Sequence, residues 1–213
     1  MGYFELLKIP KPEFDESTKT TVFLKFTRGD VGDLNAGAIA KQFRVDVETM
    51  VGTSIKKHFL FEGLSEAITN VGQHAYLDST LFRQWWLSAS IDRKEKKLSI
   101  IFYDQGVGIP TTLPRARFFE GIKEFFNTWK DSEKIEAAMR GGRSATEKLE
   151  RGKGLRNFIE FPTSYARGTL SIYSLCGMYR MHWKKGKLND SETERRNYAN
   201  SIGGTLIEWS ITL

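Results

Sequence analysis

Two periodicities divide the chain into helical and extended segments. Apolar residues between Val47 and Tyr76 recur at spacings of three and four, which is the period of a helix with one buried face. The pattern predicts one long helix that ends near Tyr76, and a similar spacing predicts a helix over 33–43. Shorter helices are predicted at 118–129, at 132–139 and from just after Gly154 to about Phe161.

β-rich segments predict the strands of one sheet. Trp85–Ile91 alternates apolar and small residues, Asp92–Lys97 is a charged turn, and Leu98–Tyr103 is an apolar run, so the three together predict a hairpin. Because helices gather early and strands late, we expect an α/β (α+β) two-layer sandwich with a mixed sheet and helices on one face. Further strands are predicted at 20–26, 168–174, 178–184 and 205–213.

The remaining segments have no clear period. Residues 1–17 are interpreted as an irregular arm, and 185–200 as a polar, charged loop. The stretch 111–151 is charged and lacks strand signals, and its end, Arg140–Thr146, has the glycine pair of a flexible segment.

Composition restricts the class of protein. A length of 213 residues with 40% hydrophobic and 27% charged residues fits one folded domain with an extension and excludes wholesale disorder. The single cysteine, Cys176, excludes an internal disulfide framework, and three scattered histidines argue against a zinc cluster. The N-terminus has no signal-peptide pattern and no run of 18 apolar residues occurs, so we expect a cytoplasmic protein without a membrane span.

Positive charge is concentrated in one stretch. The chain has 32 basic and 26 acidic residues, which gives a net charge of +6. The stretch from Arg140 to Arg167 contains seven basic residues and three acidic ones. Such a stretch admits a phosphorylated ligand, an acidic partner or nucleic acid.

A polar stripe lies on the predicted long helix. Glu66, Asn70 and His74 are spaced i, i+4 and i+8, which places a carboxylate, an amide and an imidazole on one helix face. Spacing alone also fits a solvated polar face.

Two glycine-containing segments lie next to predicted elements that could position a ligand, one after a strand and one at the start of a helix. Asp104 ends an apolar strand and precedes Gly106, Gly108 and Ile109, so it is either a turn cap or a hydrogen-bond acceptor in a pocket. The segment Gly152–Leu155, which is Gly-Lys-Gly-Leu, stands at a predicted helix start, where backbone amides and the helix dipole favour an anion.

The order of these segments resembles the GHKL (histidine kinase-like) ATPases, the superfamily of gyrase, heat-shock chaperone, histidine kinase and MutL nucleotide domains. The resemblance covers about 59–213 and implies the ATP-binding Bergerat-type fold, with a mostly antiparallel sheet. It further implies a GHKL domain over 51–213 with a long ATP-lid insertion at about 111–151, preceded by an N-terminal extension over 1–50.

Roles for individual residues also come from the resemblance. It implies that Asn70 holds Mg²⁺, that Glu66 orients or deprotonates the attacking hydroxyl, and that His74 lies near the phosphates. Asp104 would accept the adenine amino group. The pocket and the phosphate cradle would be formed by Gly106, Gly108, Ile109, Gly152, Lys153, Gly154, Leu155 and Thr205, whose hydroxyl would tether Asp104.

Three functions stay open at this point. The segments 64–70 and 74–76 look most like those of the anti-sigma-factor serine kinases, which implies phosphoryl transfer from MgATP to a protein partner. The second possible function is an ATPase whose binding to a regulated partner protein changes with the nucleotide. A nucleotide-gated binding module, for protein or for nucleic acid through the basic stretch, is the third.

Overall fold

The computed structural model describes residues 20–30, 36–76, 83–112, 128–144 and 153–213. Its strands form one sheet: β1 (Thr21–Phe23), β2 (Thr27–Asp30), β3 (Gln84–Asp92), β4 (Lys97–Asp104), β5 (Arg167–Ser174), β6 (Gly177–Lys184), β7 (Lys187–Leu188), β8 (Glu194–Asn197) and β9 (Thr205–Thr212). Its helices are α2 (Ala36–Val51), α3 (Lys57–Asn70), α4 (Ile109–Thr112), α6 (Asp131–Ser144) and α7 (Lys153–Thr163), with a π-helix η2 (Val71–Ala75) and a 3₁₀ turn η6 (Asp190–Glu192).

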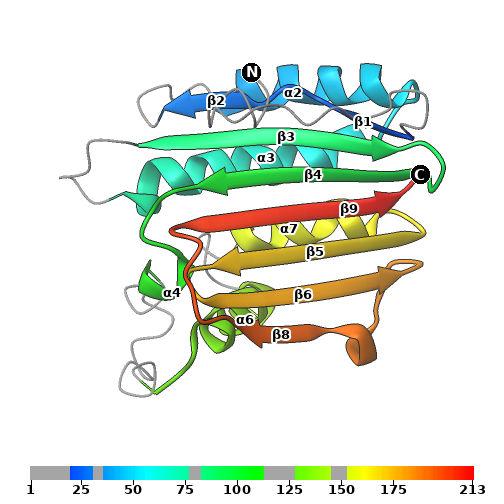
Figure 1. Ribbon diagram of the computed structural model, residues 1–213. Coiled ribbons are helices and arrows are strands. Elements are labelled where there is room, and N and C mark those ends of the chain that lie inside the picture. The colour runs from blue at the N-terminus through cyan, green and yellow to red at the C-terminus, as the bar shows by residue number, and fades with distance from the viewer. Residues whose placement is uncertain (1–19, 31–35, 77–82, 113–127, 145–152) are drawn as a thin grey trace.

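The strand order brings the last strand into the middle of the sheet. The path runs β1-β3-β4-β9-β5-β6-β7, with β2 also paired to β3 and β8 to β6 (Figure 1). Each of these pairings is antiparallel. The predicted hairpin and the predicted strands at 168–174, 178–184 and 205–213 are confirmed to within two residues at each end. The predicted loop 185–200 additionally contains β7, η6 and β8.

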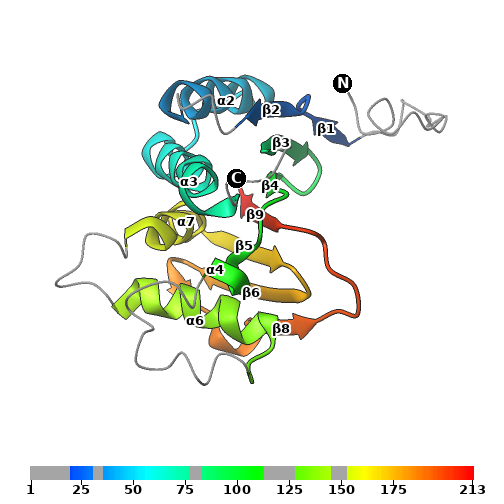
Figure 2. The same ribbon diagram turned by 90° about the vertical axis from the view of Figure 1, so that its left-hand side faces the viewer.

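The four longer helices cover one face of this sheet, so the predicted two-layer fold is confirmed. Figure 2 shows α2, α3, α7 and α6 as one layer and the strands as the other. In β4 the alternation is regular: Leu98, Ile100 and Phe102 are buried under the helices, while Ser99 and Ile101 are half-buried on the opposite face. We call that opposite side the open face of the sheet.

The predicted long helix is wrong because the chain turns at a glycine. Helix α2 ends at Val51, and Gly52 takes the left-handed φ of 77° while its N–H donates to the Glu48 carbonyl at 2.9 Å. Glycine in this conformation ends helices because it has no Cβ to clash. A second helix, α3, then starts at Lys57 and packs against α2.

Other predictions differ in detail or fall outside the described residues. The predicted flexible segment at Arg140–Thr146 is helical as far as Ser144, where α6 ends. The predicted strand over 20–26 is replaced by two short strands, β1 and β2, which both pair with β3 on the side away from β4. The arm at 1–17 and most of the helix at 118–129 lie outside the described residues. No helix in the described ranges is long and apolar enough to span a membrane.

One tryptophan joins the sheet to two helices. Trp209, on the central strand β9, is 1% exposed, and its indole Nε1 donates to the Phe158 carbonyl of α7 at 2.9 Å. The Phe158 ring meets the indole edge to face, with centroids 5.7 Å apart. Gly63 of α3 packs on the same indole, because a Cβ there would lie 3.8 Å from Trp209 Cζ2.

We predict that Trp209→Ala lowers the free energy of unfolding by about 3–5 kcal/mol, because it leaves a cavity between three elements. Trp209→Phe should cost about 1–2 kcal/mol, since it leaves the Phe158 carbonyl without its donor. Urea denaturation followed by far-ultraviolet circular dichroism measures both values. Trp86→Phe is the control, because Trp86 is half-buried on the open face, where it stacks on Tyr103. Equal losses for Trp209→Phe and Trp86→Phe would contradict this assignment.

Candidate functional site

Asp104 is a buried carboxylate at the end of a central strand. It is the last residue of β4, is 5% exposed, and lies on the helix-covered face of the sheet. Its Oδ1 accepts a hydrogen bond from the Gly106 amide at 2.8 Å, and the Thr205 backbone amide is a second donor to the carboxylate. Because an ionised carboxylate has about four acceptor positions, these two donors leave Asp104 able to accept further hydrogen bonds.

Burial changes the proton affinity of this group. Desolvation raises the pKa of Asp104 from its ordinary 3.8 to about 6, and the amides of Gly106 and Thr205 partly oppose the rise. At neutral pH the carboxylate is therefore still charged in most molecules. A charged, desolvated acceptor at the end of a sheet is costly for folding, and perturbed groups of this kind cluster at functional sites.

Thr205 faces Asp104 across the ladder, where the two residues pair directly. The Thr205 backbone amide contacts the Asp104 carboxylate, and the Thr205 hydroxyl is 2.9 Å from the Ser174 hydroxyl. A tether from the Thr205 hydroxyl to Asp104 stays a prediction. The preceding Gly204 has φ 130°, and a Cβ there would lie 2.8 Å from the Gln105 Cα. Only glycine fits such a close backbone approach.

Ser174 connects the parts of this strand-end cluster, and the sequence did not indicate it. It is fully buried at the end of β5, accepts from the Ile109 amide at 2.9 Å, and donates to the Gly204 carbonyl at 3.1 Å. The only available signal was a serine closing an apolar strand. Tyr76 is similar: its hydroxyl accepts from the Gln105 amide and donates to the Gln84 carbonyl, and burial raises its pKa.

The two glycines after Asp104 let parts of this chain approach each other. A Cβ on Gly106 would lie 2.6 Å from the Ala75 Cβ, and the Val107 amide donates to the Ala75 carbonyl at 2.7 Å. Gly108 has φ 83°, and a Cβ there would be 2.9 Å from the Ser174 hydroxyl. The space that they leave is filled by η2 and by the end of β5 with the residue after it. Contact with a ligand through their backbones stays a prediction.

Helices α3 and α7 are antiparallel, which brings the remaining predicted residues toward one end of the molecule. The Lys56 amide, just before α3, donates to the Tyr165 hydroxyl just after α7, and a Cβ on Gly63 would lie 3.3 Å from the Asn157 carbonyl. From that contact, Asn70 is seven residues on along α3, about 10 Å, while Lys153 is four residues back along α7, about 6 Å. The C-terminal end of α3 therefore lies near the start of α7.

The same end holds the strand ends. Figure 1 shows the end of β4, the start of β9 and the end of β5 together on the left, the side that α4 also occupies. Asp104 is hydrogen-bonded there to the amides of Gly106 and Thr205. Ser174 contacts Gly108, Ile109 and Thr205, and Ala75 contacts Gly106.

The predicted helix stripe is continuous only as far as Asn70. Glu66 and Asn70 are half-buried on α3, one turn apart. After Asn70 the helix changes to the wider π form over η2, so the four-residue spacing to His74 no longer keeps one face. The His74 side chain lies outside the described residues, as do all of Gly152 and the side chains of Lys153 and Leu155. Helix α7 begins at Lys153, two residues before the predicted start just after Gly154.

A divalent cation at this end of the sheet would need oxygen ligands from the protein. In the described ranges, no three His, Cys, Asp or Glu side chains form a metal cluster. Asn70 offers a carboxamide oxygen, the kind of donor that suits a Mg²⁺ ion shared with phosphate groups. Two hollows that the described residues line lie away from this end: one on the open face, the other beside Lys56 and Tyr165.

The raised pKa of Asp104 predicts a specific pH dependence of stability. Well below pH 3.8 the group is protonated in both folded and unfolded chains, and as pH rises from there toward 6 the unfolded chain ionises first, so stability falls. Above pH 6 the full penalty, on the order of 3 kcal/mol, is present. Asp104→Asn should therefore be more stable than wild type at pH 8 by about 1–3 kcal/mol, with the difference lost near pH 4.

Urea denaturation from pH 4 to 8 measures this difference. Asp92→Asn is the matched control, because Asp92 ends strand β3, is only half-buried, and accepts from the amides of Lys94 and Glu95 in a turn. A constant difference between Asp104→Asn and wild type across this pH range would contradict the assignment.

Comparison with known proteins gives limited similarities. No protein-family model and no curated protein matches the chain. Among solved structures, the 43K ATPase domain of Thermus thermophilus gyrase B in complex with an aminocoumarin matches with a TM-score of 0.34 and 13% identity, over 80% of this chain and 38% of that one. The topoisomerase IV ATP-binding domain of Francisella tularensis, in complex with a small-molecule inhibitor, matches with a TM-score of 0.33 and 13% identity, over 86% and 73%. Similarities of this size assign neither a family nor a function to the chain.

Proposed function

We propose that this protein binds ATP at the end of the sheet formed by β4, β9 and β5, as a GHKL-type nucleotide-binding protein. The observation that carries the proposal is the buried Asp104 carboxylate, charged at neutral pH and held by two backbone amides with acceptor positions to spare. The order of sequence segments that resembles the GHKL ATPases supports the same reading.

Adenine specificity would come from Asp104. An exocyclic amino group donates to a carboxylate, whereas guanine presents a carbonyl at the matching position, which Asp104 would repel. A charged hydrogen bond of this kind contributes about 1.5–3 kcal/mol, enough to discriminate between the two bases. Half-buried Ile109 would supply apolar contact to the ring.

The triphosphate would extend toward the ends of α3 and α7. The first turn of α7 has backbone amides without a partner inside the helix, at the positive end of the helix dipole, and Gly152, Lys153, Gly154 and Leu155 would surround the anion. Asn70 would hold Mg²⁺ through its amide oxygen, with His74 near the phosphates. ATP would supply a transferable phosphoryl group.

Glu66 would determine whether the bound nucleotide reacts. It lies one helical turn before Asn70, where a carboxylate could orient or deprotonate an attacking hydroxyl. A partner's serine or threonine as acceptor gives a protein kinase of the anti-sigma-factor type, and water gives an ATPase that regulates a partner protein. If Glu66 serves neither, the protein is a nucleotide-gated binding module.

We predict that MgATP raises the melting temperature more than MgGTP does, because only adenine satisfies Asp104. Asp104→Asn should weaken ATP binding roughly tenfold or more at pH 7.5, through loss of the charged acceptor. Thermal shift followed by calorimetric titration measures both effects. Glu208→Gln, a half-buried glutamate on the open face, is the control. Unchanged ATP affinity in Asp104→Asn would exclude the adenine site.

Glu66→Gln should retain ATP affinity within about threefold and lose at least 100-fold in turnover, as expected on removal of a positioned general base. Labelled ATP, with and without cell extract, distinguishes the acceptors: label on protein indicates a kinase, and free phosphate an ATPase. Undiminished turnover in Glu66→Gln would show that Glu66 is a helix-surface carboxylate without a role in the reaction. Wild type that binds ATP without any turnover would favour the binding module.

A further inference from the structure

A row of short hydroxyl side chains crosses the open face of the sheet. Ser99 on β4 pairs with Ser210 on β9, Ser210 with Thr169 on β5, and Thr169 with His182 on β6. The Ser99 and Ser210 hydroxyls are 3.4 Å apart, and the Thr169 hydroxyl is 3.0 Å from His182 Nδ1. Of this row, Ser210, Thr169 and His182 line a depression, and the two hydroxyl side chains form its floor.

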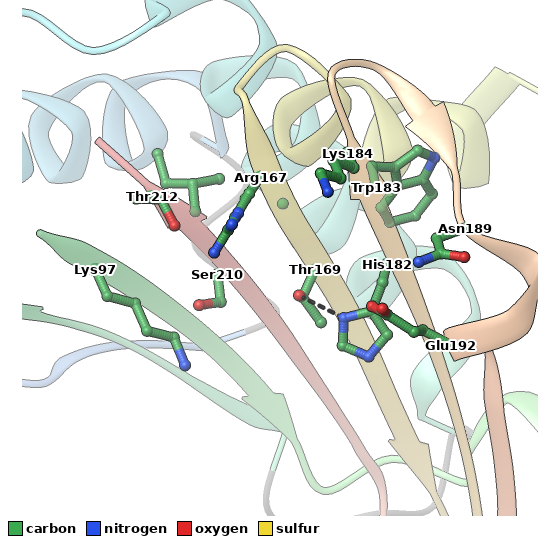
Figure 3. Close-up of a pocket in the computed structure, with 12 residues that line it drawn as sticks. Lys97, Arg167, Thr169, His182, Trp183, Lys184, Asn189, Glu192, Ser210 and Thr212 are labelled. Carbon is green, nitrogen blue, oxygen red and sulfur yellow. Dashed lines mark hydrogen bonds between the residues drawn. The ribbon is translucent and has the colours of Figure 1, made fainter. Parts of the chain in front are cut away.

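Long basic side chains form the rim of this depression. The next row along the strands holds Lys97, Thr212, Arg167 and Lys184, and Lys97 pairs with Thr212 while Arg167 pairs with Lys184. Short side chains beside long ones leave a hollow of about 380 Å³ on the open face of the sheet. Figure 3 shows Lys97, Arg167, Thr169, His182 and Ser210 on the same side of the strands, with the helices behind.

The charge in this hollow is unbalanced. Lys97, Arg167 and Lys184 are exposed, and within the described ranges none of them has an ion-pair partner. The only carboxylate among the lining residues is Glu192, on the wall that Asn189 and η6 form. Three cations above a floor of hydroxyls match a phosphate group, which accepts hydrogen bonds from both kinds of donor.

The hollow is separate from the proposed nucleotide site. Lys97 begins β4 and Asp104 ends it, seven residues away, which is about 23 Å along a strand. The two residues also lie on opposite faces of the sheet, because their side chains alternate. An occupant of the hollow therefore would not contact the Asp104 cluster.

We propose that this hollow binds a small organic phosphate, such as a sugar phosphate. Its volume falls in the range of small-molecule sites and exceeds what a bare phosphate ion fills. Lys97, Arg167 and Lys184 hold the phosphate group, and the hydroxyls of Thr169 and Ser210 donate to it. Asn189 and Glu192 on the opposite wall bind the hydroxyl groups of the remaining part.

Ribose 5-phosphate and ribose, titrated into ¹⁵N-labelled protein, test this proposal, because the two probes differ only by the phosphate. Ribose 5-phosphate should give saturable amide shifts at Thr169, His182 and Ser210 at roughly millimolar concentration, and ribose should give none. The double variant K97Q/R167Q should weaken binding roughly tenfold or more. Lys41→Gln, which removes an exposed charge on α2, is the matched control and should bind as wild type does.

Three results would overturn the proposal: equal shifts with ribose and ribose 5-phosphate, equal affinity in K97Q/R167Q and wild type, or shifts confined to the Asp104 end. A fourth would be tighter binding of a single-stranded oligonucleotide with shifts that extend to Trp86 and Tyr103, which would make the open face a nucleic-acid surface. Asp104→Asn should leave the ribose 5-phosphate shifts intact, so failure of the hollow and failure of the ATP site are distinguishable.

Discussion

The contact of Trp209 with α7 and α3 sets the geometry on which the candidate site depends. Trp209 is on the central strand, donates to Phe158, and packs against Gly63, so one indole fixes the height of both helices above the sheet. Because α3 and α7 are antiparallel, the end of one then lies near the start of the other. This packing helps to place Asn70 and the first turn of α7 at the end of the sheet where β4 ends.

Burial of Asp104 lowers the stability of the fold at this end of the sheet. A desolvated carboxylate with a pKa of about 6 opposes folding at neutral pH, and backbone amides of Gly106 and Thr205 recover only part of that cost. Ser174 and Gly204 then fix the turn and the start of β9 around it. An apolar residue at position 104 would fold with less penalty, which is why this carboxylate points to a ligand.

The sheet has two chemically different faces because its side chains alternate. Buried Leu98, Ile100 and Phe102 meet the helices, and the intervening residues point to the open face, which none of the described helices covers. On that face, antiparallel register assembles the hydroxyl floor and the basic rim of the hollow from four strands. The proposed ATP site and the proposed organic-phosphate site therefore use opposite faces and opposite ends of the same strands.

The sequence by itself determined the features that depend on local pattern: the strands at 84–92, 97–104 and 205–212, the helical layer, and Asp104 at a strand end. It predicted one helix where Gly52 separates two, because a buried stripe can continue across a turn when both helices pack on the same sheet. The π turn after Asn70, the bridging role of Ser174 and the basic hollow were decided only by the tertiary structure. The serine bridge and the hollow arise where register joins residues far apart in the chain, and no local period records that register.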